Sequence, residues 1–343
     1  MCRYRPVGWK KHALRAAGAT GLLPLAARRY GRDRLTVLAY HRVVDPARPA
    51  GGHLPNVSAD APGFAAQLDW VGDRFDVISL GDLLAWLDGD GSLPRRPLLI
   101  TFDDGYRDNL EVAAPLLAER GMPAVLFLAT GPLDGGAPFH WDLVAEMFAG
   151  RGEGSAEVPG VGRRWWRSAG EAESVADEFV AATKRLPPSA RREALESLGE
   201  VLGVAVPRRL PGLYLDWELV RSMEGWEFGA HTVDHPVLTA VDPDEAYEQV
   251  AASRSRIEAE TGVTVRAFAY PNGMSGDYGG AATAAVAAAG IDLAFTLEPG
   301  PARRREVRSA PLEVRRTYVN RSDGLPRFAA MVMGLPRMLG SWA

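Results

Sequence analysis

The chain has 343 residues, of which 47% are hydrophobic and 24% charged, and its formal net charge is −4. This is the composition of an ordinary soluble protein, which excludes a disordered or membrane-embedded chain. The negative net charge argues against nucleic acid as a partner. Cys2 is the only cysteine, which excludes an internal disulfide framework and a cysteine-based zinc cluster.

The beginning of the chain is strongly basic. Residues 1–34 hold nine Lys/Arg and one acid, a balance of +8 that leaves −12 for the rest. The longest uncharged apolar stretch there, 16–27, has 12 residues, fewer than the about 20 that span a bilayer. A signal-peptide core is one reading, since "PLAA" offers small residues for cleavage. We favour a basic arm that stays cytoplasmic or peripheral at the inner membrane face and contacts anionic lipid or a partner, with a solvated leader as the alternative.

Short apolar runs then alternate with helical patterns. Such runs, separated by helices, indicate a parallel sheet covered by helices. About eight units in roughly 290 residues favour a closed or distorted β/α barrel. The predicted strands are 35–41, 76–80, 98–102, 124–129, 227–231, 267–271, 293–297 and 314–319, and the predicted helices between them include 81–87, 109–120 and 244–261.

Two segments depart from this rhythm. Residues 133–215 contain a Gly-rich, charged loop and two amphipathic helices, 171–186 and 189–203, which predicts a helical insertion into a barrel of residues 35–324. Within it, His140 and Trp141 are candidates to line a ligand site, although most tryptophans in such segments are packing residues. Residues 325–343 form an apolar and basic tail that we expect to dock on the barrel.

Two aspartates stand back to back at the end of one buried run. In "LLITFDDGYRDN" (98–109), Asp103 and Asp104 follow five apolar or small residues. Adjacent carboxylates repel one another and are costly to desolvate. Two explanations remain: a solvated corner of the chain, or a site where a cation makes the pair favourable.

Two histidines follow another predicted strand, four positions apart. In "GAHTVDHP", His231 and His235 would share one face if the backbone made a helical turn, as metal chelation requires. Side chains at the carboxyl ends of barrel strands converge at one mouth, so an aspartate could complete a His₂-carboxylate metal site with positions left open for water.

The segments "LLITFDDGYRDN", "FGAHTVDHPVL" and "RAFAYPNG" resemble, in order and spacing, three motifs of the polysaccharide deacetylase family, also called the NodB homology domain or carbohydrate esterase family 4. The opening "LTVLAYHRVV" is similar to one branch of that family. The resemblance covers about 35–320 apart from the insertion. It implies a distorted (β/α)₇-type barrel that removes N-acetyl groups from amino sugars by metal-assisted hydrolysis.

The resemblance also implies roles for individual residues. Asp104, His231 and His235 match the metal ligands, and Asp103 matches the general base. Zinc suits these ligands best, with Co²⁺, Ni²⁺ or Mn²⁺ as alternatives. Thr232 is expected to hold the histidine loop through its hydroxyl, or else to be a simple loop residue.

The third motif implies the substrate contacts. The backbone N–H of Asn272 matches the group that helps to bind the oxyanion, and Tyr270 stands in the same motif.

Two departures from the family pattern concern the proton-handling groups. The arginine that orients the base is missing from the third motif; Arg266, a few residues earlier, is a candidate replacement, with a surface arginine as the alternative. No histidine follows His235, although the family supplies its general acid from a late histidine. His41 ends the first predicted strand and is the candidate for that acid, or else a structural histidine.

The sequence thus predicts a metal-dependent deacetylase that acts on N-acetylhexosamine residues of a polysaccharide, oligosaccharide or lipid-linked glycan. The alternatives are an O-acetyl esterase or non-sugar amidohydrolase on the same metal centre, and a catalytically weak glycan-binding protein. The acetylated glycan is the expected partner.

Overall fold

The computed structural model describes residues 33–47 and 55–338. All but the last two residues of the predicted basic arm therefore lie outside the described part of the chain, as do residues 339–343 of the tail. None of the described helices is long and apolar enough to cross a membrane.

Seven parallel strands form a curled sheet, and the predicted distorted (β/α)₇-type barrel is confirmed. The segment that contains the last strand connects the two edges of the sheet, because Val314 bridges to Phe295 while Thr317 and Tyr318 pair with the first strand. The strands, in order around the sheet, are β1 (Arg34–Tyr40), β5 (Pro97–Asp104), β6 (Ala124–Leu128), β9 (Trp226–Ala230), β10 (Ala267–Ala269), β11 (Leu293–Phe295) and β13 (Thr317–Tyr318).

Short strands and helices complete the barrel. The strands are β4 (Asp76–Val77) beside β5, β12 (Ala302–Arg303) antiparallel to β1, and a parallel pair of β2 (Arg42–Val44) and β3 (Val57–Asp60). The helices are α3 (Ala61–Gly72), α4 (Leu80–Asp88), the π-helix η1 (Asn109–Ala113), α5 (Ala114–Ala118), α6 (Thr130–Leu133), α10 (Trp217–Arg221), η2 (Leu238–Ala240), α11 (Pro243–Thr261), α12 (Gly280–Ala288), α13 (Arg304–Ser309), η3 (Pro311–Glu313), α14 (Leu325–Val332) and α15 (Leu335–Met338).

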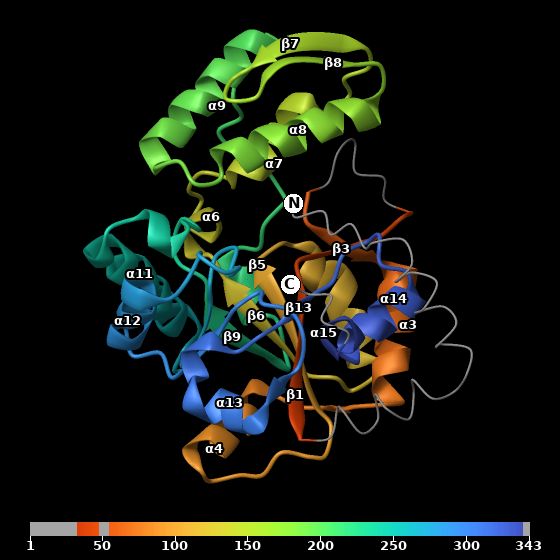
Figure 1. Ribbon diagram of the computed structural model, residues 1–343, viewed down its shortest axis with the longest axis vertical. Helices are drawn as coiled ribbons and strands as arrows, with labels where there is room; N and C mark the ends of the chain where they lie inside the picture. The colour runs from red at the N-terminus through yellow and green to blue at the C-terminus, as the bar shows by residue number, and fades with distance from the viewer. Residues whose placement is uncertain (1–32, 48–54, 339–343) are drawn as a thin grey trace.

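The pleat of β5 divides the core into two layers and aims one of the two aspartates inward. All eight residues of β5 are buried. Ile100 and Phe102 join the cluster beneath the covering helices, whereas Leu99 joins the cluster inside the barrel, to which α4 contributes Leu80, Leu83 and Trp86. Helix α4 lies at the lower end of the barrel (Figure 1). Since successive side chains of a strand alternate between faces, Asp103 shares the interior face with Leu99.

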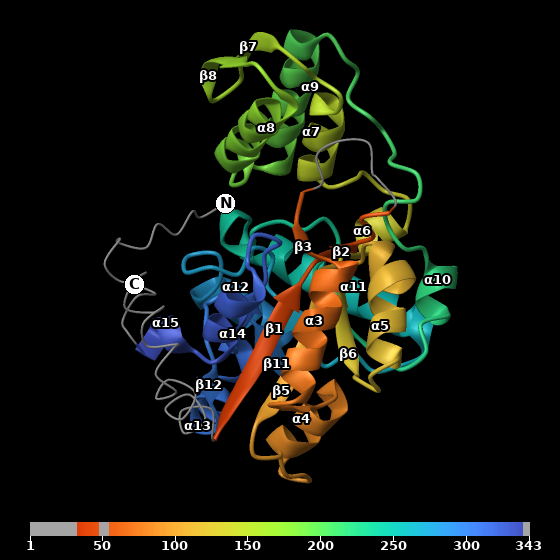
Figure 2. The ribbon, with the colours of Figure 1, turned by 90° about the vertical axis from the view of Figure 1, so that its right-hand side faces the viewer.

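The insertion forms a lobe above the end of the barrel at which the strands finish (Figures 1 and 2). It contains α7 (His140–Phe148), α8 (Ala169–Thr183) and α9 (Pro188–Leu202) around a hydrophobic cluster of its own. The predicted Gly-rich loop is instead an antiparallel hairpin of β7 (Gly154–Val158) and β8 (Gly162–Trp166). Its turn is made possible by Gly160 and Gly162, both at positive φ.

The C-terminal tail docks on the barrel as far as it is described. Phe328 and Val332 of α14 are fully buried, and the ring of Phe328 meets that of Trp70 on α3 edge-on at 5.8 Å. This apolar contact explains why α14 lies against α3.

Candidate active site

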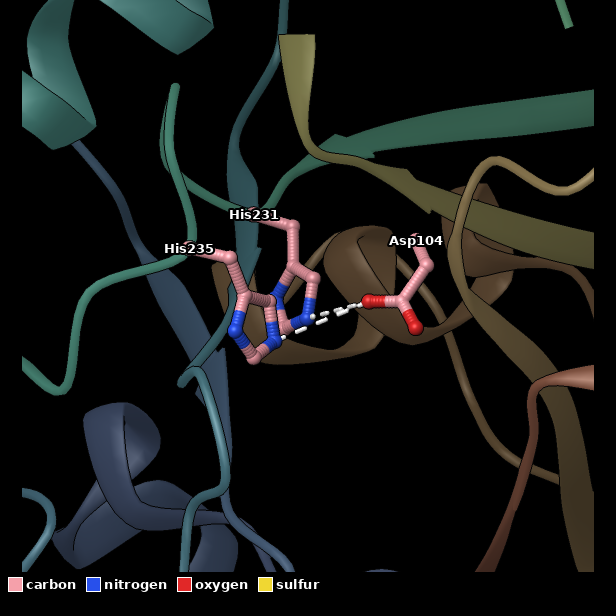
Figure 3. Close-up of side chains that lie close together, drawn as sticks. All are labelled: Asp104, His231 and His235. Atoms are coloured by element: carbon pink, nitrogen blue, oxygen red, sulfur yellow. Dashed lines mark ion pairs between the residues drawn. The ribbon is translucent and has the colours of Figure 1, made fainter. Parts of the chain in front are cut away.

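Three side chains from two strand ends converge at the barrel mouth. Asp104 ends β5, and His231 and His235 follow β9, which lies beyond β6 in the sheet. The Nε2 atom of His231 lies 3.5 Å and that of His235 lies 3.6 Å from Oδ1 of Asp104 (Figure 3). Two ligand atoms on one tetrahedral zinc lie about 3.3 Å apart, so this spacing is that of ligands around a shared ion.

The buried polar atoms of this trio fit a bound metal. Both carboxylate oxygens of Asp104 and Nε2 of His231 are buried, and none of them has a hydrogen-bond partner within the described part of the chain. Leaving a buried carboxylate unpaired is costly, so such atoms call for a cation. His231 donates from Nδ1 to the carbonyl of Ala269 at 2.7 Å, the second contact that commonly orients a metal-ligating histidine. Asp104, His231 and His235 are the group in the described chain whose ligand atoms could hold a metal ion.

The histidines reach their positions through strained loop backbone rather than the expected helical turn. Thr232 and His235 both have positive φ, 69° and 54°, and such a φ is rare for a β-branched residue such as Thr232. The hydroxyl of Thr232 donates to the carbonyl of His231 and accepts from the N–H of His235 at 3.0 Å. Gln249 of α11 accepts from the two backbone N–H groups between them. These bonds offset the strain and fix the loop.

Asp103 is held by an arginine that the sequence analysis did not select. The guanidinium of Arg316 donates to Oδ1 of Asp103 at 2.6 Å and to Oδ2 at 2.8 Å. Burial alone would raise the pKa of Asp103, but the positive charge of Arg316 dominates and lowers it below its usual value. Asp103 is therefore an anionic, rigidly oriented carboxylate beside the Asp104 trio.

Arg316 could have been found from its strand. It stands in "LEVRRTYVNR", a predicted buried strand in which one of two consecutive arginines must face inward. An inward arginine requires a carboxylate partner. The prediction that Arg266 supports Asp103 is wrong, because Arg266 binds Asp88 and Asp292 on the outside of the barrel.

His41 lies at the same mouth as the trio. Its Nε2 is 3.8 Å from Oδ2 of Asp104, and its Nδ1 is buried with no hydrogen-bond partner in residues 33–47 and 55–338. Its backbone is fixed, since its N–H donates to Ser58 Oγ and its carbonyl accepts from Asn109 Nδ2. The ring is thus presented to the site with a nitrogen available for proton transfer.

The third motif supplies one core residue and one residue of a tight turn. Tyr270 is buried in the core, and its hydroxyl donates to Thr283 of α12, so its side chain is not a substrate contact. Asn272 has φ 62° in a tight turn closed by a bond from the N–H of Gly273 to the carbonyl of Pro271. The N–H of Asn272 makes no hydrogen bond to another described residue.

The sequence matches the family model described as polysaccharide deacetylase over residues 90–153 and 191–294. The interruption between these stretches falls within the inserted lobe. YxkH of Bacillus subtilis (strain 168), a protein named for the same family, is 30% identical over 96 residues, which are 28% of this chain and 32% of that relative. The match thus spans about a third of the length of the curated relative.

Solved structures share the fold. A Streptococcus pyogenes deacetylase, PplD, in complex with acetate gives a TM-score of 0.57 at 17% identity, over 88% of this chain and 99% of that one. A de-N-acetylase from Aggregatibacter actinomycetemcomitans gives 0.59 at 18% identity, over 87% and 100%.

The curled parallel barrel, with a carboxylate and two imidazoles at its mouth, shares its fold with these solved deacetylases. The motifs place the chain more closely: it belongs to the polysaccharide deacetylase family.

Proposed function

We propose that this protein is a metal-dependent deacetylase that hydrolyses N-acetyl groups of N-acetylhexosamine residues in a polysaccharide, oligosaccharide or lipid-linked glycan. The observation that carries the proposal is the juxtaposition at one mouth of two distinct aspartates. Asp104 has unpaired buried oxygens facing two histidines, whereas Asp103 is saturated by Arg316. Asp104 is therefore suited to bind a cation, and Asp103 is suited to accept a proton.

Asp104, His231 and His235 would hold the metal, and this nitrogen and oxygen donor set favours zinc, with Co²⁺, Ni²⁺ or Mn²⁺ as substitutes. A divalent cation bound there supplies Lewis-acid polarisation of the acetyl carbonyl and acidifies the attacking water.

The chain's own groups supply the remaining chemistry. Asp103, kept anionic by Arg316, accepts the proton of the attacking water, and that oxygen bonds to the acetyl carbon. The N–H of Asn272, which bonds to no other described residue, is the candidate donor to the oxyanion. His41 donates a proton to the leaving nitrogen as the carbon–nitrogen bond breaks, which yields acetate and a free amine.

The substrate class rests on the family and on the bond to be broken. Amide hydrolysis needs a proton donor for a poor leaving group, and the mouth offers His41 for that task. One protein of the same fold is a de-N-acetylase, which agrees with an N-acetyl substrate. A contact of the basic arm with anionic lipid belongs to the same proposal, since it would bring the enzyme to a lipid-linked glycan.

The test is acetate release by the full chain from N-acetylglucosamine oligomers, with bound metal quantified in the same preparation. We expect stoichiometric metal, activity that a chelator abolishes, and recovery on adding Zn²⁺ or Co²⁺. A wild-type protein that binds no divalent metal would overturn the proposal. Acetate release from O-acetylated but not N-acetylated glycans would reassign the protein as an esterase.

A further inference from the structure

The two histidines of the trio are held in different ways. His231 has an outer hydrogen bond from Nδ1 to the carbonyl of Ala269. His235 has none, because its Nδ1 is buried without a hydrogen-bond partner among the described residues. A metal-ligating histidine almost always donates its second nitrogen to an acceptor that fixes the ring. Another contact must therefore orient His235.

That contact comes from the insertion. The rings of Trp141 and Phe139 meet the imidazole of His235 edge-on, at centroid distances of 4.9 and 5.6 Å and interplanar angles of 77° and 68°. The two aromatic rings stack on each other at 4.5 Å. We call Phe139 and Trp141 the aromatic clamp. His231 contributes a further edge-on contact, at 4.7 Å, so three rings pack against the imidazole of His235.

A buried hydrogen-bond network joins the aromatic clamp to Tyr106, in the loop that follows Asp104. Trp141 donates from Nε1 to the hydroxyl of Tyr106 at 2.7 Å, and Tyr106, two residues after Asp104, donates to Asp142 at 2.9 Å. Tyr214, where the insertion returns to the barrel, donates to the same carboxylate oxygen at 2.6 Å and accepts from the N–H of Phe139 at 3.0 Å. Both ends of the insertion thus meet at one point beside the trio.

We propose that the insertion is a positioning element of the metal site, in which the aromatic clamp orients His235 in place of an outer hydrogen bond and so sets the affinity for the metal. The inference rests on the proposed metal centre. It makes Phe139 and Trp141 positioning residues, since they act through His235. By linkage, metal binding must in turn tighten the docking of the insertion on the barrel.

The test is the metal dissociation constant, measured for Zn²⁺ and Co²⁺ by competition with a chromophoric chelator. We expect Trp141→Ala to weaken binding about 10- to 100-fold, the range found for outer contacts of metal ligands, and to change the visible absorption spectrum of bound Co²⁺. Trp141→Phe keeps a ring against His235 but loses the bond to Tyr106, so its loss should be smaller. Tyr214→Phe loosens the network without touching His235 and should also weaken binding.

The matched control is Trp165→Ala, since Trp165 lies on the distant hairpin of the same insertion with 68% of its surface exposed. Its metal affinity should equal that of the wild type. Folded Trp141→Ala with a dissociation constant within twofold of the wild type would overturn the inference. Should that variant not fold, unchanged affinity in both Trp141→Phe and Tyr214→Phe would overturn it equally. A wild type that binds no metal would instead refute the proposed function.

Discussion

Arg316 and Asp103 form a buried, two-pronged ion pair at the floor of the barrel mouth, with N–O distances of 2.6 and 2.8 Å. The arginine comes from the segment that joins the edges of the sheet, and the aspartate from β5. Arg316 also donates to Thr101 and to the carbonyl of Thr296. The position of Arg316 is therefore fixed from both sides of the seam, and with it the orientation of the Asp103 carboxylate.

The first prediction concerns this ion pair. Arg316→Lys should lower kcat by about 10²-fold or more, because a lysine cannot bind both oxygens of Asp103 and the base loses its orientation. Metal content should stay stoichiometric, since the Asp104 trio is untouched. Arg266→Lys is the matched control, because Arg266 also binds two carboxylates but on the outer surface. Equal kcat values for the two variants would contradict the role assigned to Arg316.

The second prediction concerns Asp104 and metal-dependent stability. Zinc at 1,000 times its dissociation constant should raise the free energy of unfolding of the wild type by about 4 kcal/mol. Asp104→Asn removes the carboxylate from the trio and should lose most of this increase, together with activity. Calorimetry with and without chelator measures the effect. Asp88→Asn, at the surface beside Arg266, should keep the full increase. If Asp104→Asn gains as much stability from zinc as the wild type, Asp104 is not a ligand.

The third prediction separates His41 as an acid from His41 as a ligand. His41→Ala should reduce hydrolysis of an N-acetylated oligosaccharide by about 10²–10⁴-fold. Hydrolysis of 4-nitrophenyl acetate, whose leaving group needs no proton, should fall far less. Metal content should not change. Equal losses of activity on both substrates would exclude the acid role. A loss of metal from His41→Ala would instead make His41 a fourth ligand. Metal content is measured because Nε2 of His41 lies only 3.8 Å from Oδ2 of Asp104.

The fourth prediction concerns the pH dependence of stability. Burial, together with the charges of Arg191 and Lys184, lowers the pKa of His140 to about 3 in the folded protein. In the unfolded chain its pKa is about 6.5. The unfolded state thus binds the extra proton between pH 6.5 and about 3, so the folded state loses stability as pH falls through this window.

Replacing His140 by a group that does not titrate should remove that loss. Between pH 8 and pH 4.5 the free energy of unfolding of the wild type should fall by about 3 kcal/mol more than that of His140→Asn. Denaturant titrations at the two pH values measure the difference. Parallel pH profiles for the two proteins would show that His140 is not held neutral by the fold.

The strands could be predicted from the sequence because parallel strands are buried on both faces. Stretches such as 98–102 and 124–129 carry almost no polar residues, and both became strands of the barrel. Four site residues could be predicted for a related reason, since polar residues directly after such runs must meet at one end of the barrel. They are Asp103, Asp104, His231 and His235. Local order along the chain was enough to bring these four together.

The sequence did not show which residues meet across the seam of the barrel: the strand pattern indicates that one of Arg315 and Arg316 faces inward, but not which carboxylate it binds. Arg316 lies 213 positions from Asp103, and Arg266 was the nearer candidate along the chain. The guanidinium of Arg316 reaches Asp103 only because residues 314–318 join β11 to β1. Tyr270, directly after β10, is likewise not at the mouth, because its side chain lies in the core with Phe268.

The sequence by itself determined the barrel and the residues at its mouth, because burial and strand alternation are local and periodic. These residues are Asp104, His231 and His235, with Asp103 beside them. The tertiary structure decided which arginine binds Asp103 and which aromatic residues pack against His235. It also decided how the insertion bonds to Tyr106, two residues after Asp104. Those contacts join residues whose separation along the chain carries no signal, and chain closure and packing alone bring them together.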